Sequence, residues 1–213
     1  MPVNTVDSLP LPTGVKHRRI DWNHAFWLPG YHLIALLAFL PWFFSWTGVV
    51  LAILGLYVFG TLGINLCYHR LLTHRGLTLP RWLEYSFVVL GLCCVQDTPA
   101  RWVAIHRRHH EHADEQHDPH SPLVSFFWGH MGWLLVENEE LSTLGIYDRY
   151  SKDILRDPFY RSLERSRWFL YVVASWVLFY AGGFAAALML GSSTGEAHPV
   201  SYTHLTLPTI LRV

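Results

Sequence analysis

Residues 101–122 read RWVAIHRRHHEHADEQHDPHSP, and this stretch carries the strongest pattern in the chain. On a helix, spacings of three and four residues place His106, His109 and His110 on one face. Imidazoles gathered in this way have little structural purpose without a metal, because protonated rings repel one another and neutral rings each need a hydrogen-bond partner. The stretch therefore predicts a metal-binding helix.

The polar residues around this helix show no apolar period of their own. From 97 to 122 the chain is therefore expected to be held by ligands or by neighbouring helices. Arg107 and Arg108, which lie between the histidines, are expected to point away from them, toward water or phosphate. The chain holds 14 histidines in 213 residues. Because most of them fall between His69 and His130, the usage as a whole also points to a metal.

A second histidine pattern, HRLLTH, occupies residues 69–74. A step of five residues on a regular α-helix turns His69 and His74 about 140° apart. The two rings therefore converge only if the helix ends or unwinds between them. Alone, this pattern fits two interfacial histidines at a helix end as well as it fits a metal site.

The composition favours a membrane protein. Hydrophobic residues make up 51% of the chain and charged residues only 15%, and the mean hydropathy is positive. The 16 basic residues balance the 16 acidic ones, so the overall charge gives no argument for a nucleic-acid partner. The alternative is a buried helical hairpin within a large soluble protein.

Three apolar runs are near the length of about 20 residues that crosses a bilayer. They cover 25–40, 48–67 and 168–190, and the first two form a hairpin joined by an uncharged, aromatic turn. Basic residues on both sides of the hairpin share one membrane face, which the positive-inside rule makes cytoplasmic. These residues are Lys16, Arg18, Arg19, Arg70, Arg75 and Arg81. The sequence thus predicts an all-α, multi-pass integral membrane protein with both histidine patterns on the cytoplasmic side.

The segments between these runs complete the organisation. Residues 82–95 and 125–136 are apolar but short, which is typical of interfacial helices. Residues 137–167 are charged, with a break at Asp157. We expect a cytoplasmic N-terminal segment at 1–24, a membrane domain at 25–190, and an atypical tail at 191–213 that is rich in Ser, Thr and Pro.

The remaining histidines and the cysteines have simpler interpretations. His24 and His32 are expected to be hydrogen-bonded structural residues, and His112 and His117 to be solvated or near the metal site. His130 belongs to no pattern by its spacing. The cysteines, Cys67, Cys93 and Cys94, are expected to be buried and reduced. Residues 1–16 show no secretory signal peptide.

Four sequence words together give a resemblance to a known family. They are YHRLLTHRGL at 68–77, RWVAIHRRHHEHADEQHDPHSP at 101–122, FFWGHMGWLL at 126–135 and DPFYRSL at 157–163. They resemble the membrane fatty acid desaturases, in particular the branch of acyl-CoA and bacterial acyl-lipid delta-9 enzymes.

This resemblance implies a specific chemistry and site. It implies two iron ions, O₂ as co-substrate, two electrons from a ferredoxin or a cytochrome b5-type protein with its reductase, and a cis double bond in an acyl chain carried by CoA or lipid. The implied location is a bacterial inner membrane. The implied iron ligands are His69, His74, His106, His109 and His110, with Trp102, Asp118 and His120 as supporting residues.

The sequence also departs from the family. The family's fourth span and third histidine box, of the HxxHH type, are missing, and only His198 and His204 follow the third run. Three crossings would place both on the opposite face from the boxes. Because five imidazoles cannot supply two irons with four or more ligands each, we expect this chain to hold metal weakly and to be inactive. The ending SYTHLTLPTILRV reads as a foreign or frame-shifted terminus.

Two other functions remain open from the sequence. A related membrane di-iron hydroxylase or ketolase would share the iron chemistry but insert oxygen, so product analysis would separate it from a desaturase. A non-catalytic membrane protein that binds a metal through the two boxes is the other alternative.

Overall fold

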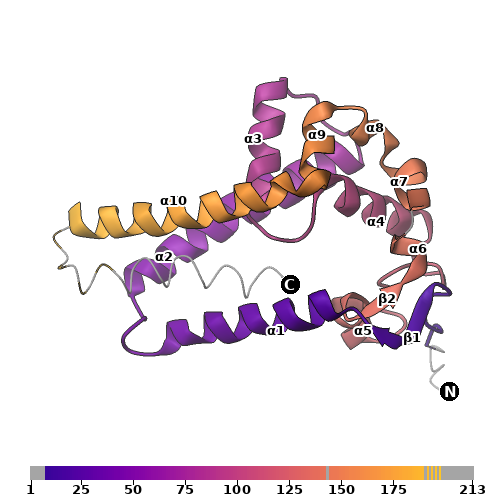
Figure 1. The fold of residues 1–213 in the computed structure, drawn as a ribbon, viewed down its shortest axis with the longest axis horizontal. Helices are drawn as coiled ribbons and strands as arrows, with labels where there is room; N and C mark the ends of the chain where they lie inside the picture. The colour runs from indigo at the N-terminus through magenta and orange to yellow at the C-terminus, as the bar shows by residue number, and fades with distance from the viewer. Residues whose placement is uncertain are drawn as a thin grey trace, which may run out of the picture.

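The computed structural model describes residues 8–189 apart from 143, together with 191, 193, 195 and 197. The predicted tail, with His198 and His204, thus lies mostly outside the described residues. The described chain is mainly helical (Figure 1). Its elements are β1 (Val15–Ile20), α1 (Trp22–Leu36), η1 (Leu37–Phe39), α2 (Trp46–Gly55), η2 (Leu56–Thr73), α3 (Arg81–Leu92), α4 (Pro99–Glu111), α5 (Phe126–His130), η3 (Gly132–Leu134), β2 (Val136–Asn138), α6 (Glu139–Ser142), α7 (Leu144–Tyr150), α8 (Lys152–Leu155), α9 (Pro158–Ser162), η4 (Leu163–Arg167) and α10 (Trp168–Met189).

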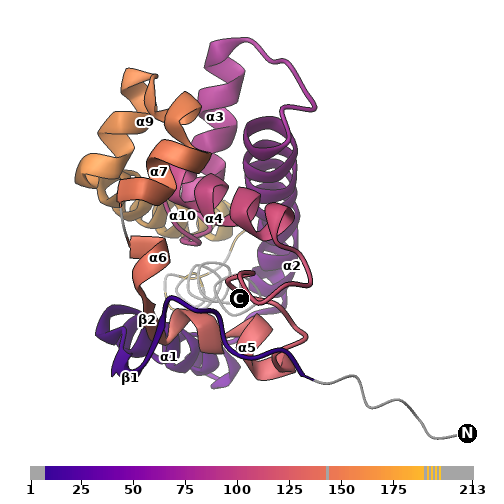
Figure 2. The ribbon, with the colours of Figure 1, turned by 90° about the vertical axis from the view of Figure 1, so that its right-hand side faces the viewer.

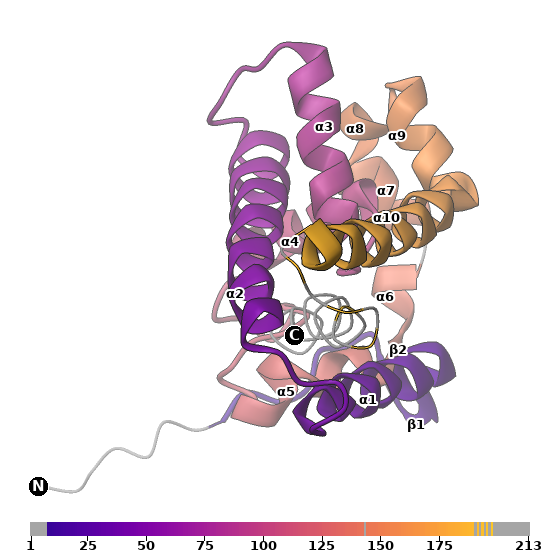
Figure 3. The same cartoon turned by 90° about the vertical axis from the view of Figure 1, so that its left-hand side faces the viewer.

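Three long helical segments lie along the long axis of the molecule. α1 runs out, the chain turns, and α2 returns and continues directly into η2 (Figure 1). α10 extends in the same direction as α1. Seen from the end that carries the turn, α2 lies to the left, α10 in the centre and α1 below them (Figure 3). The predicted hairpin is therefore present as two consecutive, oppositely directed segments.

Two of these segments are long and apolar enough to cross a membrane. Among the described residues they are Trp46–Thr73, with 28 residues, and Trp168–Met189, with 22 residues. Only 22% of the most apolar stretch of each helix is buried, whereas the core helix of a soluble protein is mostly buried. They correspond to the second and third predicted runs. α1 has only 15 residues, which is below the spanning length, so the structure supports two of the three predicted spans.

α3 lies crosswise to α10 (Figure 1), as expected for the short apolar segment that was predicted to be interfacial. It packs against η2 through a close crossing at Gly63 and Gly91. A Cβ atom on Gly63 would come within 2.4 Å of the Gly91 backbone nitrogen, and one on Gly91 would meet the Tyr68 ring at 2.5 Å. The two glycines thus let α3 lie directly against the part of η2 that precedes His69.

A small sheet departs from the predicted all-α fold. β1 pairs antiparallel with β2, and the pairing contains a register shift between Val15 and Ile20. Lys16 in β1 also forms an ion pair with Glu139 at 2.9 Å. β1, β2, α1 and α5 gather at one edge of the molecule, opposite α3 and α9 (Figure 2). The strands could not be predicted from the sequence, because they pair residues over a hundred positions apart and the polar β1 shows no period-2 apolar pattern.

α4, which carries the second histidine pattern, is anchored at its N-terminus by a carboxylate from η4. Glu164 accepts hydrogen bonds from the Thr98 hydroxyl (2.9 Å) and from the Ala100 backbone N–H (3.2 Å), so it satisfies a free donor of the first turn. Val103 and Ala104 are fully buried. The expectation that ligands or neighbouring helices hold this segment is confirmed for the helices, because α4 packs against η2 and α7.

The charged segment before α10 folds into short helices that attach to α3. The Tyr160 hydroxyl donates to Glu84 (2.6 Å), and the Tyr85 hydroxyl donates to Asp157 (2.7 Å). Asp157 also caps α9 by accepting from the Phe159 backbone N–H (2.8 Å). The predicted break at Asp157 is thus a helix start, which follows from a capping aspartate before proline.

Candidate metal centre

The first histidine pair lies at the C-terminal end of η2. This segment has π-helical geometry, in which hydrogen bonds join residues five apart. The His74 backbone N–H donates to the His69 carbonyl (3.1 Å), and the Thr73 hydroxyl donates to the Tyr68 carbonyl (2.8 Å). Residues five apart lie much nearer to one face on such a helix than on an α-helix, and the His69 and His74 Nε2 atoms lie 3.1 Å apart. The expectation that the helix must depart from regular α geometry is confirmed.

The second pair comes from the last two turns of α4. The Nε2 atoms of His106 and His110 lie 3.2 Å apart, as the four-residue spacing on a helix predicts. Trp102, one turn earlier, packs its ring against His106 with a centroid distance of 4.6 Å. This contact with the indole restricts the orientation of the His106 ring.

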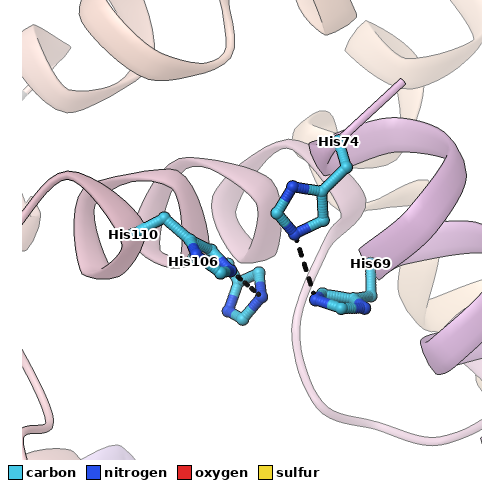
Figure 4. Close-up of side chains that lie close together, drawn as sticks. All are labelled: His69, His74, His106 and His110. Atoms are coloured by element: carbon cyan, nitrogen blue, oxygen red, sulfur yellow. Dashed lines mark hydrogen bonds between the residues drawn. The ribbon is translucent and has the colours of Figure 1, made fainter. Parts of the chain in front are cut away.

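η2 and α4 bring the two pairs together. One nitrogen from each of His69, His74, His106 and His110 lies within 4.8 Å of the others. Figure 4 shows the rings of η2 on one side of a common centre and those of α4 on the other. The centroid of His69 is 4.9 Å from that of His106, and the centroid of His74 is 4.5 Å from that of His110. We call these residues the four-histidine cluster.

The α4 members of the cluster favour the uncharged state. Burial, together with the neighbouring histidines His110 and His69, lowers the pKa of His106 to about 3. Burial and the nearby His74 also lower the pKa of His110. Neutral imidazoles are the form that binds metals, so competition from protons is reduced at this site.

His109, the fifth predicted ligand, lies apart from the four. Its Nδ1 is 2.9 Å from both carboxylate oxygens of Asp118, which is 1% exposed. His120 lies beside it, with a ring centroid distance of 4.4 Å. His109, Asp118 and His120 form the second group of potential metal ligands among the described residues.

The charges in this second group are coupled. The hydrogen bond to Asp118 raises the pKa of His109 despite partial burial. Burial raises the pKa of Asp118, but the hydrogen bonds from His109 and the His120 backbone N–H outweigh it and leave that pKa low. The Asp118 carboxylate therefore holds His109 through Nδ1 and leaves Nε2 as its free ligand atom.

These donors fit a transition metal. Imidazole nitrogen suits Fe, Zn, Cu and Ni, whereas magnesium and calcium prefer oxygen ligands. The four-histidine cluster holds no carboxylate, and its members come from two elements that are each fixed by packing. The residues present thus fit an iron site, and four of the five histidines predicted as ligands lie together, whereas His109 belongs to the other group.

The remaining histidines have the simpler roles expected of them. His24 pairs with Asp21 (2.8 Å), and the His32 ring donates to the Leu28 carbonyl (2.7 Å). His112 and His117 line a polar hollow of about 550 Å³ beside α4 and α7 and belong to neither metal-ligand group. His130 stacks on Phe126.

The prediction for the arginines between the histidines was wrong. Arg107 turns inward to the end of η2 and to Asp153, and Arg108 pairs with Glu140. Sequence reasoning missed Asp153 entirely. A buried arginine needs hydrogen-bond acceptors, so the sequence indicated that Arg107 would have partners. It did not indicate that Asp153 is one of them.

The described part of the chain is a helical structure with two helices long and apolar enough to cross a membrane and a histidine cluster that could hold a metal ion. The family model for fatty acid desaturase matches residues 44–206, and the chain belongs to this family. It is similar to an sn-1 stearoyl-lipid 9-desaturase of Anabaena variabilis, at 39% identity over 78% of this chain and 60% of the relative. It is also similar to an sn-2 palmitoyl-lipid 9-desaturase of Nostoc sp. (strain 36), at 34% identity over 86% of this chain and 67% of the relative.

Another relative is named for an acyl chain bound to CoA instead of to a lipid. An acyl-CoA 5-desaturase of Anemone leveillei is 36% identical over 83% of this chain and 57% of the relative. The chain therefore spans less than two thirds of the length of the Anabaena and Anemone relatives.

Proposed function

We propose that this protein is a fatty-acyl desaturase that introduces a cis double bond, at the delta-9 position, into a saturated acyl chain. The observation that carries the proposal is the four-histidine cluster, formed by two helices of a chain that belongs to the fatty acid desaturase family. The delta-9 position is supported by the names of the cyanobacterial relatives.

The proposed centre holds two irons. His69, His74, His106 and His110 would hold the first, and His109 would contribute its Nε2 to the second. Asp118 would orient His109 through the hydrogen bond to Nδ1, and Trp102 would fix the His106 ring. His120 lies beside His109 and supports its position. Bound iron would supply the dioxygen chemistry that no side chain can provide.

The proposed reaction balances with an external reductant. A saturated –CH₂–CH₂– unit, O₂, two electrons and two protons give –CH=CH– and two waters. The chain's own part is to hold neutral imidazoles around one centre and to bring an acyl chain to it. The apolar faces of α2, η2 and α10 are mostly exposed, which suits segments that meet lipid acyl chains. The burial of His106 keeps its ring uncharged while the centre is empty.

The proposed partners follow from the relatives and from the electron count. The acyl chain is carried by a lipid or by CoA, since relatives are named for both. A ferredoxin or a cytochrome b5-type protein with its reductase would deliver the electrons. We place the domain that does this at residues 25–190, in a bacterial inner membrane, with both histidine pairs on the cytoplasmic side.

The test is the product formed in a desaturase-deficient host. The chain is expressed alone and as a chimera in which residues 44–189 replace the matching region of the Anabaena relative. The chimera should yield monounsaturated fatty acids, and the same chimera with His106→Ala should yield none. An alcohol or ketone would instead identify a hydroxylase or ketolase. A chimera that binds iron but forms no oxidised product would favour a non-catalytic metal-binding protein.

A further inference from the structure

The two halves of the four-histidine cluster come from different elements, so their separation must be set by something between them. η2 and the residue that follows it supply His69 and His74, and α4 supplies His106 and His110. A misplacement of one pair by about 1 Å is enough to spoil a preorganised site. The structure therefore needs a contact that fixes the end of η2 against α4.

One side chain makes this contact with all of its donors. Arg107 Nε donates to the Thr73 carbonyl (3.1 Å) and Nη2 to the Leu72 carbonyl (2.6 Å). Nη1 donates to the Tyr150 carbonyl (2.6 Å), and both terminal nitrogens donate to the Asp153 carboxylate at 2.8 and 3.2 Å. Its side chain is 19% exposed, so these bonds are largely shielded from water.

Two of the three carbonyls that Arg107 binds, those of Leu72 and Thr73, lie between His69 and His74 in the chain. Leu72 and Thr73 end the helix, where carbonyls lack partners within the helix. A cation at this position also interacts favourably with the helix dipole. Arg107 follows His106 directly in α4, so one guanidinium joins the backbone beside His74 to the backbone beside His106.

Asp153 extends the link to the other side of His74. Its carboxylate also accepts from Arg75, at 2.6 Å. Arg75 directly follows His74 and has a φ of +52°, which a residue with a side chain adopts only at some cost. The contacts to Asp153 thus hold both the last turn of η2 and the left-handed residue that ends it.

We infer that Arg107 is a positioning residue that sets the distance between the two histidine pairs, with Asp153 as the carboxylate that orients it. This inference rests on the proposed metal-binding role of the four-histidine cluster. A lysine cannot replace Arg107, because its single ammonium cannot serve carbonyls of two segments and a bidentate carboxylate at once.

Co²⁺ binding to the purified chain of residues 1–213 in detergent micelles tests the inference. The variants are Arg107→Lys and Asp153→Asn, and the matched control is Arg108→Lys. Arg108 is the next residue of the same helix, and its contacts are Glu140 and the His117 carbonyl. The readouts are the Co²⁺ affinity, the visible absorption spectrum of bound Co²⁺, and the thermal midpoint of the metal-free protein.

Arg107→Lys should weaken Co²⁺ binding by about 10–100-fold, the usual effect of losing a residue that orients ligands, and should alter the Co²⁺ spectrum. Asp153→Asn should also weaken Co²⁺ binding and alter the Co²⁺ spectrum, but by a smaller amount. Arg108→Lys should leave both at the wild-type values. If Arg107→Lys fails to fold, Asp153→Asn decides by the same two readouts.

The outcomes separate this inference from the proposed function. Wild-type affinity and spectrum in the folded Arg107→Lys and Asp153→Asn proteins would overturn the positioning role. A lowered thermal midpoint with an unchanged spectrum would also overturn it, since that is the result of a merely structural contact. If the wild-type chain binds Co²⁺ no better than a His69→Ala, His106→Ala double variant, the proposed metal site itself fails.

Discussion

The Nε2 atoms of His69 and His74 lie 3.1 Å apart although a regular α-helix would turn the two side chains away from each other. The π-helical hydrogen bond from the His74 N–H to the His69 carbonyl accounts for this geometry. The five-residue spacing of the first histidine pattern and the helix type at the end of η2 are thus matched, and π-helical segments are frequent at functional sites.

The pairing of these two histidines predicts non-additive losses. His69→Ala and His74→Ala should each reduce Co²⁺ affinity by at least tenfold, because each removes one ligand from a shared ion. The double variant should lose less than the product of the two single effects, since ligands of one site act as a unit. Isothermal titration with Co²⁺ measures the affinity of the two single variants and of the double variant. Strictly additive losses would mean that the two rings bind independently.

The hydrogen bond between His109 and Asp118 predicts a selective loss at the second metal position. Asp118→Asn removes the carboxylate that orients His109 and should reduce metal affinity there by about 10–100-fold. The four-histidine cluster should keep its metal, because Asp118 contacts none of its members. Metal content and Co²⁺ spectra distinguish the two positions. An equal loss at both positions would contradict the separation of His109 from the other four.

The lowered pKa of His106 predicts a pH-dependent cost in the metal-free protein. Its pKa falls from an ordinary 6.5 to about 3 on folding. Below pH 6.5 the unfolded chain therefore binds a proton that the folded chain rejects, so the free energy of unfolding decreases as the pH falls from 6.5 toward 3. After a discount for solvent screening, the loss between pH 7.5 and pH 5 is about 1 kcal/mol.

The variant His106→Gln should remove this part of the pH dependence. Unfolding in mixed micelles at pH 7.5 and pH 5 measures it, with His112→Gln as a control from the same helix end. The wild-type protein should lose more stability on acidification than His106→Gln does. An identical loss in both proteins would show that His106 titrates normally in the fold.

The arrangement of the spans predicts the side on which α4 lies. A cysteine at Glu111, which is exposed at the end of α4, should escape membrane-impermeant labelling from outside intact cells. A cysteine at Trp42, which is 78% exposed in the turn between α1 and α2, should be labelled. The native cysteines should contribute little labelling of their own, because Cys67, Cys93 and Cys94 are buried. Labelling at Glu111 with none at Trp42 would reverse the proposed topology.

The sequence was sufficient to predict two of the long helices and the four histidines that meet, although it also grouped His109 with them. Local spacing placed His106, His109 and His110 on one helical face, and the apolar runs located η2 and α10. These features depend on neighbours within a few residues or on the mean hydropathy of about 20 residues. The need for a non-α turn between His69 and His74 also followed from their spacing alone.

Features that depend on distant partners could not be predicted. The pairing of β1 with β2 and the contact of Arg107 with Asp153 join residues far apart in the chain. Of the five histidines predicted as ligands, His109 lies apart from the other four, and its position depends on which carboxylate reaches it. Asp118 does so across a loop with no periodic pattern, so only the folded structure locates it.

The most direct test of the account is X-ray absorption on the iron-loaded, purified chain, recorded beside its iron content. The account predicts a first iron whose coordination shell is made of histidine nitrogens. This iron should be lost in the His69→Ala, His106→Ala double variant and kept in His32→Ala, whose ring bonds only within α1. An iron shell without imidazole, or an iron content that the double variant leaves unchanged, would contradict the central claim that these histidines form the metal site.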